Sequence, residues 1–219
     1  MTSTIKKSLQ DILSPMVLKF ILKIGIGSIV LWVAILGYFW SNFSTFVTSY
    51  LTWIPFEWLQ NSVAYVAAPF VGYTLIIVTI AILTSLFSEG LLINLAKKHY
   101  PNIKAIATPS IGGSLSSTLS SSLVFALMYL ILFPTFFIPI IGQGIMLYVW
   151  SILLKAPTVH DVGGLFIKDK KELKSKRKKS NLIAMIASLF NYIPILNIFA
   201  PIFAQIMFLH HILGRKERV

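Results

Sequence analysis

The chain turns twice in the middle of apolar sequence, once at Phe137-Ile138-Pro139-Ile140-Ile141-Gly142-Gln143 and once at Tyr192-Ile193-Pro194-Ile195-Leu196-Asn197. The surrounding runs, residues 123–154 and 182–213, contain no charged residue. An α-helix rises about 1.5 Å per residue and the hydrocarbon core of a bilayer is about 30 Å thick, so half of a run, roughly a dozen residues, reaches only about 20 Å. Both runs are therefore predicted to form helical hairpins that enter the membrane and turn back.

The composition is that of an integral membrane protein. Hydrophobic residues make up 56% of the 219 residues and charged residues only 12%, and the mean hydropathy is +0.81. Values of this kind place a chain in the membrane class. The sequence has no cysteine, which excludes disulfides, a thiolate nucleophile and cysteine-ligated metals. We predict one all-α membrane domain over residues 1–219.

The positions of the basic residues predict the topology. All 19 lysines and arginines lie before residue 24 or within 97–104, 155–179 and 215–218. If 20–40 and 63–87 each cross once, and both hairpins return to the side from which they entered, every basic residue lies on one face. The positive-inside rule makes that face cytoplasmic. The same distribution argues against nucleic-acid binding, so we expect a multi-pass protein with both termini in the cytoplasm.

The remaining segments are predicted to lie at the cytoplasmic surface. Residues 1–19 are predicted to form an interfacial helix that ends near Pro15, because apolar residues recur there at helical spacing opposite Lys6, Lys7 and Asp11. Residues 155–181 are predicted to form a basic loop, so that both segments meet anionic headgroups. The hairpins are assigned to 114–154 and 182–213, since polar but uncharged Ser114 to Ser122 can lengthen the first.

The hairpin turns carry residues suited to irregular backbone. Pro139 and Pro194 lack an N–H donor, Gly142 and Asn197 can adopt unusual backbone angles, and Gln143 follows the first turn. Irregular backbone at membrane depth is tolerated only inside the protein or against a watery cavity. We expect both turns to face an interior, either a pore or packed helices, and favour packing.

Four stretches together resemble the CysZ sulfate-permease family and its eukaryotic relatives, the etoposide-induced membrane proteins. They are Ser14-Pro15 leading into Phe20, Phe87-Ser88-Glu89-Gly90-Leu91-Leu92, the first turn, and residues 188–201, which include the second turn. The resemblance extends along nearly the whole chain. It implies long spanning helices with part-penetrating hairpins, in the cytoplasmic (inner) membrane, and movement of sulfate or a like oxyanion into the cytoplasm.

The resemblance also indicates a substrate site. A helix that starts at Gly90-Leu91-Leu92 would offer unpaired N–H groups and a partial positive charge to an anion, and Lys19 would supply a cation where the family carries arginines. Glu89 departs from the family, which usually has a neutral residue there. It is interpreted either as a coupling or gating group or as an acidic residue that stabilises the helix start.

Other chemistry is not expected. His210 and His211 are adjacent and so point to different sides of a helix, and His99 and His160 lie in basic loops, so no metal site and no cofactor are predicted. Serines at 114, 117 and 121 share one helical face, which favours helix packing over catalysis. The chain is predicted not to be an enzyme. Two functions remain open: a transporter or channel for small oxyanions, which we expect to be a homo-oligomer, or a non-transporting scaffold of the same fold.

Overall fold

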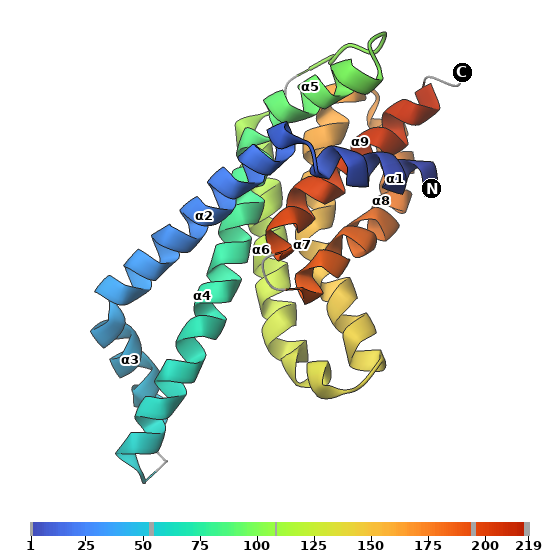
Figure 1. Ribbon diagram of the computed structural model, residues 1–219. Helices are drawn as coiled ribbons and strands as arrows, with labels where there is room; N and C mark the ends of the chain where they lie inside the picture. Colours follow the sequence, from blue (N-terminus) through green and yellow to red (C-terminus); the bar gives the residue numbers. More distant parts are fainter. Residues whose placement is uncertain (1, 53–54, 108, 194–195, 217–219) are drawn as a thin grey trace.

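The computed structural model describes residues 2–52, 55–107, 109–193 and 196–216, and these residues form helices and connecting turns, without a strand (Figure 1). The all-α fold class is confirmed. The short helices are α1 (Thr2–Ile12), α3 (Trp40–Ser49), α5 (Glu89–His99), and the 3₁₀ turns η1 (Phe133–Phe137), η2 (Leu189–Tyr192) and η3 (Leu196–Phe199). The long helices are α2 (Pro15–Tyr38), α4 (Glu57–Phe87), α6 (Ile111–Leu132), α7 (Ile141–Phe166), α8 (Lys170–Ser188) and α9 (Ala200–Lys216).

Within the described part of the chain, four segments are long and apolar enough to cross a membrane: Pro15–Tyr38, Glu57–Phe87, Ile111–Phe137 and Leu196–Gly214. The first two contain most of the predicted crossings at 20–40 and 63–87. They are α2 and α4, which lie side by side and extend beyond the hairpins (Figure 1). Their apolar outer surfaces are exposed, as expected of helices whose solvent is lipid.

The turn between α6 and α7 owes its shape to close backbone contacts. Ile141 N–H donates to the Pro139 carbonyl oxygen at 2.7 Å, which closes a three-residue turn around Ile140. Ile140 has a φ of 65°, so the unusual backbone angle expected at Gly142 falls two residues earlier. Gly142 is needed for another reason, because a Cβ at this position would collide with the carbonyl oxygen of Thr135.

The expectation that the first turn faces an interior is wrong. The side chains of Phe137, Ile138 and Ile140 are exposed, and Ile140 retains 86% of its accessible surface. The turn needs no protein cover because it satisfies much of its own backbone: Ile138 N–H donates to Thr135, and Gln143 Nε2 donates to the Phe136 carbonyl oxygen at 3.0 Å. The side chains that the turn exposes are apolar.

The turn between α8 and α9 packs its asparagines into the protein, as expected, although Ile193 remains exposed. Asn191 and Asn197 are buried, and the Asn197 side chain lies within hydrogen-bonding reach of Tyr73 on α4. Ile198 of η3 packs on Gly25 of α2. Pro194 lies outside the described residues. Figure 1 shows that the end of α8 and the start of α9 lie nearer to α5 than the α6–α7 turn does.

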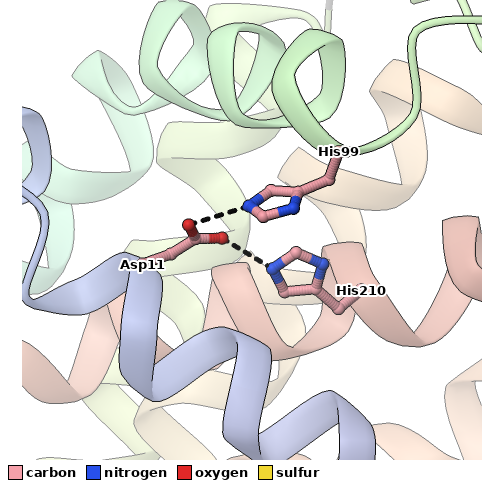
Figure 2. A group of neighbouring side chains, drawn as sticks. All are labelled: Asp11, His99 and His210. Atoms are coloured by element: carbon pink, nitrogen blue, oxygen red, sulfur yellow. Dashed lines mark hydrogen bonds and ion pairs between the residues drawn. The ribbon is translucent and has the colours of Figure 1, made fainter.

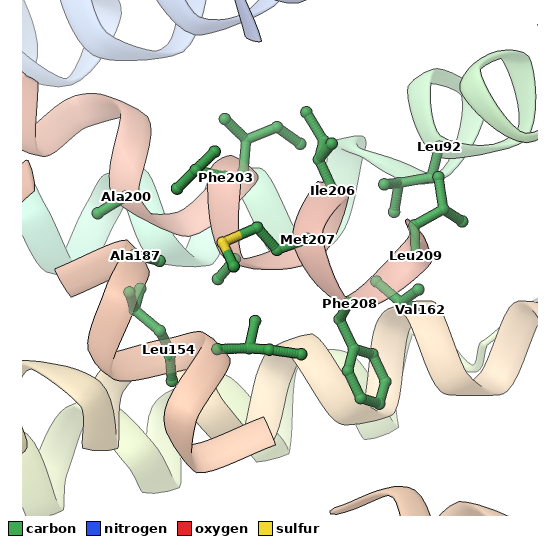
Figure 3. Packing of buried hydrophobic residues seen from close by; sticks show 14 of the residues in the cluster. Leu92, Leu154, Val162, Ala187, Ala200, Phe203, Ile206, Met207, Phe208 and Leu209 are labelled. Carbon is green, nitrogen blue, oxygen red and sulfur yellow. The ribbon is translucent and has the colours of Figure 1, made fainter. Parts of the chain in front are cut away.

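Helix α9 is the centre of the core. Almost every side chain between Ala200 and His210 is buried, and Ile206, Met207, Phe208 and Leu209 are fully so. Figure 3 shows these side chains packed between Val162 of α7, Ala187 of α8 and Leu92 of α5. The helices that position the candidate site are therefore held by one shared hydrophobic cluster.

The predicted basic loop 155–181 is mostly helical. Helix α7 continues through Lys155 to Phe166, and α8 begins at Lys170, with Asp169 as its N-cap. Lys, Glu and Arg are good helix formers, so the charges indicate where a helix leaves the apolar region and not where it ends. The start of α2, helix α5, the α7–α8 junction and the end of α9 gather at one end of the molecule (Figure 1).

Helix α1 ends at Ile12, and Pro15 begins α2. Its apolar side chain Leu9 and the following Leu13 are exposed, as an interfacial helix requires, whereas Ser8 and Asp11 are buried against the protein. The helix packs on α9, from the other end of the sequence. The polar side of α1 was expected to face water, but part of it faces the protein.

Candidate functional site

A small polar cavity lies where α4 meets α5. It has a volume of about 20 Å³ and is lined on its polar side by Ser85, Ser88 and Glu89 from the α4–α5 segment, Ser114 from α6 and Asp161 from α7. Leu86, Leu92, Pro109, Ile111 and Leu165 complete the lining. A space of this size holds about one water molecule. A larger ligand would require the surrounding helices to move apart.

Asp161 is the centre of a buried hydrogen-bond network beside the cavity. Ser85 Oγ donates to Asp161 Oδ2 at 2.6 Å, and Gln205 Nε2 of α9 donates to the same oxygen at 3.1 Å. His160 Nδ1 lies 3.3 Å from the other carboxylate oxygen. The network thus joins α4, α7 and α9. Gln205 Oε1 is buried without a partner among the described residues, so it remains free to accept a hydrogen bond.

Burial raises the pKa of Asp161 above the usual range of an aspartate, although hydrogen bonds with Ser85, Ser114 and His160 oppose this shift. A raised pKa favours the neutral carboxyl group. Asp161 lies outside the four segments that are long and apolar enough to cross a membrane.

The start of α5 carries backbone donors that its own helix does not pair. Leu92 N–H donates to the Ser88 carbonyl oxygen, whereas the first N–H groups of an α-helix, here those of residues 89–91, have no acceptor within that helix. The Ser88 hydroxyl, on a residue only 1% exposed, also lacks a described partner. An unpaired buried polar group costs about 1–3 kcal/mol, which marks the α4–α5 junction as a place where a ligand could be bound.

The structure brings only some of the predicted site residues together. Glu89 and Leu92 line the cavity. Leu91 and Leu92 bury their side chains in the core, so they could contact a ligand chiefly through the backbone. Gly90 is exposed, and a Cβ there would meet no atom within 4 Å. Lys19 is exposed on α2 and does not line the cavity.

The predicted turn residues Pro139, Gly142, Gln143 and Asn197 lie in the hairpin turns described above and do not line the cavity. Ser114, interpreted from sequence as a packing residue, lies 3.3 Å from His160 Nδ1. The same nitrogen also faces Asp161. A single nitrogen cannot relay a proton from Ser114 to the carboxylate in the manner of a catalytic triad, which requires both ring nitrogens.

Sequence reasoning missed Asp161, His160 and Gln205 as members of the site. It placed His160 and Asp161 in a loop because of Lys155, although one signal was present: Asp161 is followed by the apolar Val162-Gly163-Gly164-Leu165-Phe166. An acidic residue directly before an apolar stretch indicates a buried, paired carboxylate. Its partners Ser85 and Gln205 are too distant in sequence to be found by spacing.

The fold and the cavity define a multi-pass membrane protein with a buried polar site at one end. Residues 4–201 match the family described as Sulfate transporter CysZ/Etoposide-induced protein 2.4. The chain belongs to this family, as its motifs indicated. Membership in the family indicates a membrane transporter-like function. No curated protein and no solved structure matches the chain.

Proposed function

We propose that this protein moves sulfate or a related small oxyanion across the membrane, and that the anion binds at the α4–α5 junction. The observation that carries this proposal is the buried hydroxyl of Ser88, which has no partner among the described residues and lies at the start of α5, where the first N–H groups have no acceptor within their own helix. Oxyanions bind readily at helix starts because several N–H groups point outward along the helix dipole. Gly90 has no side chain to obstruct the approach.

Two carboxylates beside the site affect how an anion could bind. Glu89 and Asp161 both line the cavity, and a charged carboxylate repels an oxyanion. Burial of Asp161 favours its neutral form. We therefore propose that anion binding is accompanied by protonation of Asp161, so that uptake increases as the pH falls.

The distribution of charge supports an orientation. The helix ends that carry the basic residues gather at one end of the molecule (Figure 1), and the cavity lies at the α4–α5 junction near that end. By the positive-inside rule, this end faces the cytoplasm of the inner membrane. Lys19, exposed near the start of α2, would increase the local anion concentration.

Uptake of labelled sulfate into proteoliposomes tests the proposal. Ser88→Ala removes a hydroxyl that has no described partner, so this variant should fold normally and lose uptake if the hydroxyl binds the anion. Ser28→Ala is the matched control, because Ser28 is equally buried but its hydroxyl donates to the Ile24 carbonyl oxygen of its own helix. Sulfite, thiosulfate and phosphate serve as competitors.

Gly90→Ala is a second variant. A Cβ at Gly90 meets nothing in the protein, and Ala stabilises a helix by about 0.5–1 kcal/mol relative to Gly, so lost uptake could not be attributed to misfolding. Gly27→Ala on α2, where a Cβ also meets nothing, is the control. Lys19→Ala is compared with Lys23→Ala in the same way.

The scaffold function is the second candidate. It is favoured by the two carboxylates at the cavity and by the position of Lys19 outside the cavity lining. Uptake by folded, oriented protein that is no faster than in empty liposomes would favour the scaffold. Saturable uptake that Ser88→Ala and Gly90→Ala abolish, while their controls do not, would favour the transporter.

A further inference from the structure

We propose that Asp11, His99 and His210 bind a divalent transition-metal ion of the Zn²⁺ class, and that this ion joins α1, α5 and α9. These residues lie away from the cavity at the α4–α5 junction, and they come from three helices that are far apart in the sequence. Figure 2 shows the carboxylate of Asp11 between the two imidazole rings.

The geometry of the three side chains fits a metal-binding set. Asp11 Oδ1 lies 2.8 Å from His99 Nε2, and Asp11 Oδ2 lies 2.8 Å from His210 Nε2. One ligand atom from each residue lies within 4.8 Å of the other two. In a tetrahedral Zn²⁺ site, with metal–ligand distances near 2.1 Å, neighbouring ligand atoms are about 3.4 Å apart. Since the three ligand atoms already lie within 4.8 Å of one another, each would need to move by roughly an ångström or less to reach this spacing.

The burial of the set leaves one open side. The side chains of Asp11 and His210 are 1% exposed, whereas that of His99 is 22% exposed. Two histidines and one carboxylate supply three ligands, and a water molecule entering beside His99 would supply the fourth. Three protein ligands with one open position are a recurrent Zn²⁺ arrangement.

Tyr100 holds His210 in place for this role. Its hydroxyl oxygen lies 2.9 Å from His210 Nδ1, and Tyr100 is itself buried. When Nε2 binds a metal, the ring proton resides on Nδ1, which can donate to the tyrosine oxygen. An outer partner of this kind fixes the tautomer and orientation of a metal-binding histidine.

Asp11 already has a cation as a neighbour, and this cation can give way to a metal ion. Lys98 Nζ lies 3.3 Å from Asp11 Oδ1, but its side chain is 57% exposed. It can therefore move into solvent when a doubly charged ion neutralises the carboxylate.

The bound ion would fasten α1 to the core. Helix α1 contacts the rest of the protein mainly through α9, and its apolar side chain Leu9 is exposed. A single ion would link this surface helix to both α9 and the end of α5. Ligand binding to the folded state raises its stability by mass action.

Cobalt titration of tag-free, chelator-treated protein in detergent tests this site. We expect one Co²⁺ per chain, with the visible absorption of four-coordinate cobalt, displacement by Zn²⁺, and an increase in Tm with Zn²⁺. His99→Gln and Asp11→Asn should lose both the absorption and the Zn²⁺-dependent shift in Tm. Tyr100→Phe should weaken binding by about 10-fold to 100-fold, because the ligands remain but the outer partner is lost.

The control is His211→Gln, which removes the adjacent histidine of α9 outside the set and should bind Co²⁺ as the unaltered protein does. His99 is part-exposed at the end of α5, so its substitution keeps the fold, and Tm without metal checks this. Binding by His99→Gln equal to that of the unaltered protein would overturn the proposal. So would Co²⁺ uptake by the unaltered protein that does not exceed that of His99→Gln.

Discussion

Tyr192 donates its hydroxyl hydrogen to the main-chain oxygen of Gln143, and this bond ties the turn of the second hairpin to the helix that follows the turn of the first. Gln143 in turn donates its side-chain amide to the Phe136 carbonyl oxygen. The two hairpins are therefore connected at their turns as well as along α7, α8 and α9. A rigid connection of this kind would make the hairpins move as one body.

Tyr192→Phe should lower the free energy of unfolding by about 1 kcal/mol, because it removes one hydrogen bond between the two hairpins. Thermal unfolding in detergent measures the change. Tyr148→Phe, on an exposed side chain of α7, is the control and should have little effect. Equal stabilities of the two variants would show that the bond contributes nothing.

Gly142→Ala should destabilise the first hairpin severely, because its Cβ would occupy the position of the Thr135 carbonyl oxygen. The turn would have to open to relieve the collision. Gly144→Ala on the same helix is the control, since a Cβ there meets nothing within 4 Å. Circular dichroism during heating compares the variants, and similar melting curves would contradict the turn geometry.

Ile140→Gly should stabilise the protein, in contrast to most substitutions by glycine. A β-branched residue with a φ of 65° carries backbone strain of about 1–3 kcal/mol, and glycine adopts this angle freely. Ile138→Gly is the matched control because Ile138 has an ordinary extended conformation, with φ −86° and ψ 114°. The Tm of Ile138→Gly should fall while that of Ile140→Gly rises. A fall in both would show that Ile140 is not strained.

Asp161→Asn should change how stability depends on pH. Because burial raises the pKa of Asp161 in the folded protein, the folded state keeps its proton to higher pH than the unfolded state does. This contribution to stability is complete below about pH 4, the ordinary value of an aspartate, and is lost as the pH rises through the folded pKa.

An asparagine has no such titration, because its side chain is neutral at every pH. The difference in Tm between Asp161→Asn and the unaltered protein should therefore grow in favour of the variant as the pH rises. Asp169→Asn, at the exposed N-cap of α8, should show no comparable trend. A difference that stays constant with pH would contradict the assignment.

The depth of the hairpins can be measured because the chain contains no native cysteine. Cysteines at Ile140 and Ile193 lie at exposed positions of the two turns, so their reactivity depends on the membrane and not on burial in the protein. We expect both to resist an impermeant thiol reagent added from outside, and a cysteine at the exposed Glu57 to react. Labelling of both turns from outside would contradict the predicted part-penetrating hairpins.

The sequence predicted the parts of the fold that depend on neighbouring residues. Apolar runs interrupted by Pro139 and Gly142 indicated the first hairpin, because length and turn chemistry are local properties. Reasoning from neighbouring residues also led to two wrong predictions. The charge of Lys155 was interpreted as a loop, although the helix continues past it, and Gly142 was assigned an angle that Ile140 adopts.

The buried clusters could not be predicted because their members are far apart. Ser85 and Asp161 are separated by 76 positions, and Asp11 and His210 by 199. Adjacent His210 and His211 do point to different sides of α9, as expected, yet His210 finds its partners on α1 and α5. The spacing of residues within one helix carries no information about contacts between helices that are distant in the sequence.

The contact between α1 and α9 has a consequence for the order in which the protein matures. Asp11 is made early in synthesis, but the histidine that holds it at 2.8 Å is made 199 residues later. Until residue 210 leaves the ribosome, the carboxylate can meet His99 and Lys98 but lacks the buried histidine of α9. Closure of α1 onto α9 is thus a late assembly step, and it can report that the membrane core is already in place.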